Sequence, residues 1–273
     1  MFNFALILLL FQPMPVEFTV MTFNVRYDNP DDGESAWAHR ISWVADEMSK
    51  ADLIGVQEAL SHQVQQLAVV LDGYEWVGVG RDDGEQQGEF APIFYKTSVF
   101  EPLEVKTIWL SDFPDQPGSV GWDAALPRIA TLVTLKIRKT GKVIQVINTH
   151  FDHRGVDARL KSAKLITDHL QKMDQPVILL GDFNATPESD VYSILTEQDL
   201  RDARIITQKP AEGPIGTFSG FLQQDQLNQA PRIDYIFGSD HFVVQRYEAV
   251  VSVKNGRYVS DHLPVMVDFQ IME

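Results

Sequence analysis

The chain contains no cysteine among its 273 residues. This absence excludes disulfide bonds, thiolate metal ligands, a cysteine nucleophile and a lipid-modified cysteine near the N-terminus. Any metal site must therefore be built from carboxylate, amide and imidazole groups. The absence does not assign the protein to a cellular compartment.

Basic residues are scarce. The chain has 23 Lys and Arg residues against 38 Asp and Glu residues, which gives a formal net charge of −15. Tight, passive binding of long nucleic acid depends on many Lys and Arg side chains, so this charge disfavours it. It does not exclude a nuclease, because carboxylates that gather to bind divalent cations also make a chain acidic.

Long apolar runs, flexible linkers and internal repeats are also missing. The apolar block at residues 4–11 is too short to span a bilayer, although it has the length of a signal-peptide core. No basic residue precedes Arg26, and no small-x-small cleavage motif precedes Val16, so the sequence favours a secreted or periplasmic location only slightly over a cytoplasmic one. We expect residues 1–15 to be a signal or N-terminal apolar segment and residues 16–273 to be one monomeric domain, with no dedicated nucleic-acid or membrane domain.

Hydrophobic periodicity predicts alternating helices and strands. Runs rich in branched residues indicate strands, and apolar residues three and four apart indicate helices. The strands between residues 74 and 110 are expected to form an antiparallel group, and residues 111–126 form a long loop between Trp109 and the strand at 129–137, with Trp122 inside it. That loop either walls the substrate site or plugs a sheet edge with its aromatic residues. Strands are predicted at 16–25, 53–56, 129–137, 143–148, 176–180, 233–237, 241–253 and 263–271, and helices at 37–50, 61–71 and 158–173, with a further short helix after a Thr186 cap and Pro187.

The segment Gly181-Asp182-Phe183-Asn184 follows a short apolar run that is typical of a strand buried on both faces. Asp182 and Asn184 are two residues apart in extended chain, so they project from the same side and could hold a water or an oxyanion between them. Taken alone, a stretch of this kind is an ordinary turn about twice as often as it is a catalytic pair. Other strand ends carry similar chemistry, which favours the catalytic interpretation.

Acids, amides and imidazoles recur at the ends of the predicted strands. Each has a structural explanation when taken singly: His150, for example, is more often a hydrogen-bonded core histidine than a catalyst. Their joint occurrence predicts a site at one edge of a sandwich, on buried strands of one sheet. These residues are Asn24, Glu58, His150, Asp182 with Asn184, Asp234, and Asp261 with His262.

The chain resembles the endonuclease/exonuclease/phosphatase superfamily, in a bacterial single-domain branch. The resemblance rests on six short motifs that occur in the family's order and on the tighter segments around Trp122 and Phe151. It implies an α/β fold, namely a deoxyribonuclease I-like four-layer α/β/β/α sandwich. The motifs are Thr22-Phe23-Asn24, Gln57-Glu58, Asn148-Thr149-His150, Gly181-Asp182-Phe183-Asn184, Ile233-Asp234-Tyr235-Ile236 and Ser260-Asp261-His262.

The resemblance also implies a divalent cation, usually Mg²⁺, with Mn²⁺ or another ion as an alternative. Glu58 would hold it with help from Asn24 and Asp261, and oxygen ligands suit Mg²⁺. Asp182 would orient or deprotonate the attacking water, and Asn184 would position that water or a phosphoryl oxygen.

Further roles are implied for the histidines and their neighbours. His262, paired with Asp234, would bind phosphate or act in acid/base transfer, and His150 would contact phosphoryl oxygens or serve as a second acid/base. Three substrate-binding candidates follow from the same resemblance. Glu89 would support His150 or be a solvated turn residue, Arg128 would reach the substrate phosphate or form a surface ion pair, and Asp152 lies in the matching segment Phe151-Asp152-His153.

The expected activity is Mg²⁺-dependent hydrolysis of a phosphodiester or phosphomonoester. A nuclease acting on short RNA or DNA ends is an alternative. A phospholipid head-group phosphodiesterase would need an exposed apolar insertion, for which the 111–126 loop is the candidate. A non-catalytic binding module is a further alternative, although all the expected rim residues are present.

Overall fold

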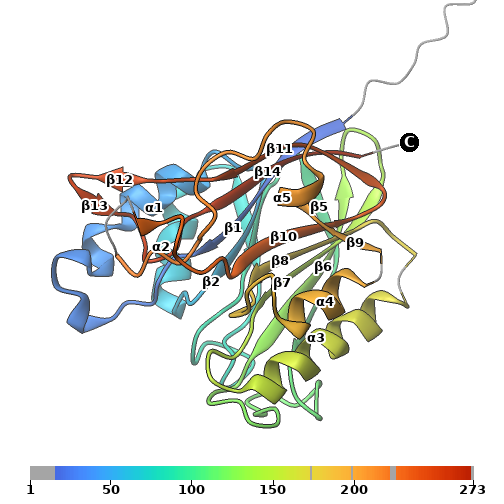
Figure 1. The fold of residues 1–273 in the computed structure, drawn as a ribbon, viewed down its shortest axis with the longest axis horizontal. Coiled ribbons are helices and arrows are strands. Elements are labelled where there is room, and N and C mark those ends of the chain that lie inside the picture. Colours follow the sequence, from blue (N-terminus) through green and yellow to red (C-terminus); the bar gives the residue numbers. More distant parts are fainter. Residues whose placement is uncertain (1–15, 173, 198, 222–225, 272–273) are drawn as a thin grey trace, which may run out of the picture.

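The computed structural model describes residues 16–172, 174–197, 199–221 and 226–271, so the N-terminal segment 1–15 lies outside the described residues. Two six-stranded sheets form the centre of the molecule (Figure 1). The first contains, in spatial order, β11 (Phe242–Ala249), β14 (Val265–Ile271), β1 (Val16–Asn24), β2 (Leu53–Gln57), β4 (Ile93–Lys96) and β3 (Tyr74–Val77). The second contains β5 (Phe100–Trp109), β6 (Ile129–Ile137), β7 (Val143–His150), β8 (Val177–Asp182), β10 (Asp234–Ser239) and β9 (Leu200–Asp202), and a small ribbon pairs β12 (Val253–Lys254) with β13 (Arg257–Tyr258).

Alternate residues of the two sheets meet in the central core. Val20 of β1 and Leu53 of β2 belong to one buried cluster with Val146 of β7 and Leu180 of β8. Because side chains alternate along a strand, the intervening residues face outward and need a second cover. Face-to-face packing of the sheets therefore requires helices on both outer surfaces.

Helices supply that cover (Figure 1). The outer face of the first sheet packs with residues of α1 (Ile41–Met48) and α2 (Ser61–Val70), whereas that of the second sheet packs with α3 (Val156–Leu170) and α4 (Asp190–Thr196). The described residues also form the helical segments η1 (Pro30–Ser35), η2 (Trp37–His39) and α5 (Ala203–Ile206). The four-layer α/β/β/α sandwich expected from the sequence is confirmed. No helix among the described residues is long and apolar enough to cross a membrane.

Several local expectations differ from the structure. The helix predicted at 37–50 is interrupted at Arg40, whose buried guanidinium donates to the carbonyls of Ser35, Val25 and Val259. The strand at Phe100–Trp109, expected in one antiparallel group with the strands from 74 onward, pairs instead with β6 in the second sheet. The predicted Thr186 cap is wrong, because the Ser189 hydroxyl accepts the hydrogen bond from the Tyr192 amide and α4 begins at Asp190.

Strand direction determines where the chemistry gathers. β1 and β2 are parallel neighbours in one sheet, and β7 and β8 are parallel neighbours in the other. Their carboxyl ends carry Asn24, Gln57, His150 and Asp182. The prediction that the strands of one sheet carry the site is therefore wrong. The site lies where the ends of two facing sheets meet.

Candidate active site

Strand register places three of the predicted site residues in one row. His150 pairs with Asp182 between β7 and β8, and Asp182 pairs with Asp234 between β8 and β10. Asp182 follows Leu180 at a spacing of two, and Leu180 lies in the core between the sheets, so the Asp182 carboxylate also points between the sheets. Asn24 of the first sheet lies four residues after Val20, and this even spacing likewise turns it toward this row.

Glu58 reaches the site because the backbone changes direction. Simple alternation after Val56, which packs beneath the helices, would point Glu58 toward the helical layer. Glu58 instead has a φ of 65°, in the left-handed region that non-glycine residues rarely adopt, and Asn184 has a φ of 47°. Such backbone strain clusters at functional sites. Glu58 thereby brings Oε1 to 2.9 Å from the Asn24 side-chain nitrogen.

Asn24 joins the two sheets at the centre of the site. Its Nδ2 lies 3.1 Å from Asp182 Oδ2 and 3.4 Å from His262 Nε2, while its Oδ1 accepts a hydrogen bond from the Arg26 amide. As placed, Asn24 offers a donor to the surrounding acids rather than an oxygen to a cation. Its predicted role as a metal ligand stays a prediction.

His262 and Asp234 form a buried pair. Nδ1 of His262 lies 3.1 and 3.0 Å from the two carboxylate oxygens of Asp234, and the side chains are 5% and 1% exposed. Burial alone would lower the pKa of His262, but the charge and hydrogen bond of Asp234 raise that pKa well above its usual value. His262 is therefore the charged histidine of the site, with Nε2 directed toward Asp182.

His150 differs from His262 in charge. Burial, followed by the nearby Arg128 and Arg81 guanidinium groups, holds the pKa of His150 well below its usual value, so the imidazole is neutral. Asn184 Nδ2 donates to the Phe151 carbonyl at 3.1 Å and lies 3.1 Å from His150 Nε2. The carbonyl fixes the amide orientation, so His150 Nε2 acts as the acceptor and Nδ1 carries the proton.

Asp182 has the properties of a general base. Its carboxyl is 1% exposed, and burial, together with the negative charge of Asp234, raises its pKa to about 7 in spite of the opposing charge of His262. Oδ1 accepts a hydrogen bond from the Asn184 amide, and Oδ2 faces Asn24 and the two histidines. A carboxylate with a pKa near neutrality is suited to accepting a proton during catalysis.

Glu89 lies behind His150. Its Oε2 is 3.8 Å from His150 Nδ1 and 2.6 Å from Nη1 of Arg81. Burial raises the pKa of Glu89 to about 7, although the charge of Arg81 opposes this shift. The structure thus brings Glu89 to the histidine that it was expected to support.

Arg128 and Asp152 form a second buried pair beside this histidine. Arg128 Nε lies 3.2 Å from Asp152 Oδ2, its Nη2 lies 2.9 Å from His153 Nδ1, and its buried Nη1 has no hydrogen-bond partner among the described residues. Arg128 also lines a small cavity with His150. The surface ion pair considered from the sequence is a buried one.

Asp152 has no open edge for a substrate. Its two oxygens accept hydrogen bonds from the amides of Arg154, Gly155 and Ala125 as well as from Arg128. Burial would raise the pKa of Asp152, but these backbone hydrogen bonds lower it to about 2. The geometry differs from the predicted substrate contact: Asp152 braces Arg128 and the surrounding loop.

The neighbouring acid, Asp261, is engaged by other groups. Its Oδ2 lies 3.4 Å from Arg26 Nη1, and its Oδ1 accepts from the Ser260 hydroxyl at 3.3 Å. Arg26 also makes a two-point contact with Asp32. Asp261 was expected to help hold a cation, but in the structure it faces a guanidinium.

The structure supplies a set of groups that could hold a metal ion. Ligand atoms of Glu58, Asp182 and His262 lie within 4.8 Å of one another. Because His262 is charged, its nitrogen has no lone pair for a metal, and the two carboxylates are the suitable ligands. Carboxylate oxygens with space for water fit a hard divalent cation.

A buried polar layer beneath the catalytic row had no role assigned from the sequence. Gln57 Nε2 donates to Thr22 Oγ1 at 3.0 Å and to Asn148 Oδ1 at 2.6 Å. Asn148 in turn donates to the carbonyls of Val56 and Pro92. The layer ties the two sheets together under the site. Thr22 and Asn148 sit at inward positions of otherwise apolar strands, which is the signal that could have identified them.

The 111–126 loop is tied to the start of α3. Asp123 Oδ1 accepts the amide of Ala158 at 2.6 Å, and Trp122 Nε1 donates to Asp112. Trp109 is buried with Ala91 and Ile129 and donates to the Arg81 carbonyl. Trp109 thus fills a sheet edge.

Comparison with known proteins identifies the family. The model of the endonuclease/exonuclease/phosphatase family matches residues 21–262. The chain belongs to this family. Its members are hydrolases that cleave phosphoester bonds.

Solved structures of the family resemble the chain over nearly its whole length. A Bacteroides vulgatus endonuclease/exonuclease/phosphatase is 36% identical with a TM-score of 0.89, covering 94% of this chain and 100% of that one. A mannosyl-6-phosphatase of Bacteroides thetaiotaomicron is 35% identical with a TM-score of 0.85, covering 92% of this chain and 99% of that one.

Curated relatives are more distant. The CCR4-Not complex 3'-5'-exoribonuclease subunit Ccr4 of Mycosarcoma maydis is 22% identical over 338 residues, which is 93% of this chain and 50% of that protein. The chain therefore spans about half the length of this relative.

Proposed function

We propose that the protein is a Mg²⁺-dependent phosphoesterase that hydrolyses a small phosphomonoester. The observation that carries the proposal is the convergence of Asp182, His262 and Glu58 around Asn24, although these groups come from distant segments of two sheets. An acid poised near neutral pH, a charged histidine and a carboxylate suited to a cation are the groups that metal-assisted hydrolysis requires.

The residues divide the reaction between them. Asp182 accepts the proton of a water that attacks phosphorus, while the side-chain oxygen of Asn184 accepts a hydrogen bond that orients this water. His262, kept charged by Asp234, donates from Nε2 to a phosphoryl oxygen. The P–O bond to the alcohol breaks as the bond to water forms, and the leaving oxygen takes a proton from solvent water.

Glu58 is the principal candidate for holding Mg²⁺, with Asp182 beside it. When bound, the cation supplies positive charge against the phosphoryl oxygens. Neutral His150, whose Nε2 accepts from Asn184, would keep that amide in position.

Two observations favour a small monoester. The 35% identical relative is described as a mannosyl-6-phosphatase, and the net charge of −15 opposes binding of a polyanion. A 3'-5' exonuclease acting on short ends is the second candidate, because the curated relatives include an exoribonuclease subunit.

The test compares purified protein with Asp182→Ala and His262→Ala in the presence of Mg²⁺. The substrates are phenyl phosphate, bis(4-nitrophenyl) phosphate and a short single-stranded RNA. We expect phosphate release from the monoester, with a loss of about 10²-fold or more in each variant, as for removal of one preorganised electrostatic group. Folded variants that match the parent rate would refute the assigned roles, and faster cleavage of RNA would favour the exonuclease.

A further inference from the structure

A cavity of about 310 Å³ adjoins the proposed catalytic centre. Asn184, which contacts His150, forms part of its wall, and the rest comes from the beginning of α3 and the segment leading into α4. A substrate whose phosphoryl group lies at this centre would thus have its organic part beside the cavity. We call it the Asn184 cavity.

The polar groups of the Asn184 cavity are largely unengaged. Exposed Asp190 and the half-buried Thr186 hydroxyl make no hydrogen bond or ion pair among the described residues. Arg159 uses Nη1 to donate to the Asp152 carbonyl at 2.9 Å, and the remainder of its guanidinium has no partner in the described chain. The cavity therefore presents an acceptor-only carboxylate, a donor-only guanidinium and a hydroxyl.

Charge and shape narrow the class of ligand. Asp190 and Arg159 are the only charged residues that line the cavity among those described, and their charges cancel. The cavity therefore has no net charge that would attract a second phosphate group of the substrate. No aromatic side chain is among the described lining residues, which removes the stacking platform on which bases bind. A volume of about 310 Å³ is at the small end of the range for ligand pockets, which suits a small ligand.

We infer that the Asn184 cavity binds the uncharged, polyhydroxylated part of the substrate, a sugar whose phosphate ester is cleaved, with Asp190 and Arg159 as specificity-determining residues. This inference rests on the proposed phosphoesterase function. Each sugar hydroxyl both donates and accepts, so neighbouring hydroxyls can satisfy the carboxylate and the guanidinium together. The aliphatic side chains of Leu160 and Val191 provide the apolar part of the wall.

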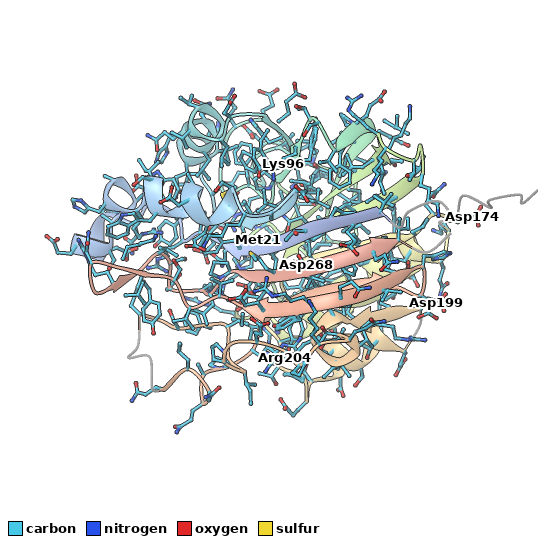
Figure 2. The ribbon with its side chains drawn as sticks, turned by 90° about the horizontal axis from the view of Figure 1, so that it is seen from above. Met21, Lys96, Asp174, Asp199, Arg204 and Asp268 are labelled. Atoms are coloured by element: carbon cyan, nitrogen blue, oxygen red, sulfur yellow. The ribbon has the colours of Figure 1, made fainter. Side chains whose placement is uncertain are left out.

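A second, slightly larger cavity of about 330 Å³ does not compete for this role. Its lining includes Val177 and Ser239, which lie at the opposite ends of β8 and β10 from Asp182 and Asp234. Asp174 and Asp199, also in its lining, lie at one end of the molecule in Figure 2. A substrate bound there would be a strand's length from the catalytic groups.

The test measures specificity rather than activity alone. The parent and the variants Asp190→Ala, Arg159→Met and Thr186→Val are assayed with Mg²⁺ on mannose 6-phosphate and on phenyl phosphate, which lacks sugar hydroxyls. We expect the ratio of kcat/KM for mannose 6-phosphate to kcat/KM for phenyl phosphate to fall about tenfold or more in the Asp190 and Arg159 variants, as for the loss of charged hydrogen bonds, and less in Thr186→Val. The effect should appear mainly in KM for the sugar phosphate.

Matched controls are available on the same elements. Glu188→Ala removes an exposed acid two residues from Asp190, and Lys164→Met removes a base from the exposed side of α3; neither lines the cavity. Both should retain the parent's specificity ratio. If the parent hydrolyses both substrates and the cavity variants keep the parent ratio, the inference is overturned while the proposed function stands. If the variants lose both activities equally, the residues are structural and the inference is also overturned. A parent inactive on both substrates refutes the proposed function and the inference with it.

Discussion

Asp234→Asn tests whether the charge of one histidine depends on a single carboxylate. Asp234 contacts Nδ1 of His262 with both oxygens, and both side chains are almost fully buried. The variant keeps the shape and one hydrogen-bond acceptor but removes the negative charge. It leaves the rest of the catalytic row in place.

The structure predicts linked changes in two pKa values. The charge of Asp234 raises the pKa of His262 against the effect of burial, so its removal should let burial dominate and lower that pKa toward or below the usual 6.5. The same charge helps to raise the pKa of Asp182, so the pKa of Asp182 should fall below about 7. Losing the charged donor at neutral pH should reduce kcat by about 10²- to 10³-fold, the range for a preorganised electrostatic group.

The parent and Asp234→Asn should differ in how their activity depends on pH. In the parent, His262 stays charged through neutral pH, whereas in Asp234→Asn it loses its proton as pH rises through the lowered pKa. Residual activity in the variant should therefore shift to lower pH, and the ratio of parent to variant activity should increase from pH 5.5 to 8. Phosphate release measures the activity, and NMR titration of the His262 ring in metal-free protein measures the pKa.

Asp202→Asn is the matched control. Asp202 is 3% exposed and lies 2.5 Å from Arg232 Nη2, outside the catalytic row. Its loss should lower stability without moving the pH profile, because a broken buried ion pair costs several kcal/mol wherever it lies. If Asp234→Asn leaves the His262 titration and the pH profile of the parent unchanged, the electrostatic argument fails.

Three other outcomes are expected. Asn184→Ala should lower kcat about tenfold while retaining cation affinity, because it removes the donor that fixes His150; steady-state kinetics and calorimetry would show this, and an unchanged kcat would count against it. Phe183→Ala should lower the free energy of unfolding by about 3 to 5 kcal/mol in urea titrations, because its ring packs edge-on against Phe151 and Tyr235 and is 1% exposed; a loss below 1 kcal/mol would contradict the packing argument. Raising salt from 50 to 200 mM should change kcat/KM by less than about threefold for a small monoester, whereas a loss of about 10³-fold or more would indicate nucleic acid.

Much of the architecture follows from hydrophobic periodicity. The branched runs at β1, β2 and β8 pack within the two sheets, and the spacing at Ile166 predicts the buried side of α3. Sheet membership does not follow from periodicity, because the strand at Phe100–Trp109 has the same alternation in either sheet and its partner is determined by long-range pairing with β6. Thr186 failed as a cap because Pro187 only resembles a helix start, whereas Ser189 places its hydroxyl at the Tyr192 amide.

The site was partly predictable for a similar reason. The residue types at strand ends can be read directly from the sequence, so Asn24, His150 and Asp182 could be selected in advance. Side-chain direction cannot be read from the sequence in this way. The left-handed backbone at Glu58 and the ion pair formed by Asp261 depend on neighbours in three dimensions. The division of charge between the two histidines likewise comes from Asp234 on one side and two arginines on the other.

The burial of Asp182 makes cation binding and folding interdependent. In the metal-free protein its folded pKa of about 7 exceeds the ordinary value of 3.8. A raised pKa favours the protonated form in the folded state. The contribution of Asp182 to stability is therefore fully present below pH 3.8 and is lost as pH rises through about 7. The difference of about three pKa units corresponds to a loss on the order of 4 kcal/mol. A divalent cation beside Glu58 and Asp182 would offset that loss by stabilising the ionised carboxylates.

Mg²⁺ should therefore raise Tm more at pH 8 than at pH 5.5, as measured by calorimetry. This gain should shrink in Glu58→Gln, because an ion that binds the folded state stabilises it more when its affinity is higher. An equal rise in Tm at both pH values, or one that survives Glu58→Gln undiminished, would mean that the ion binds elsewhere.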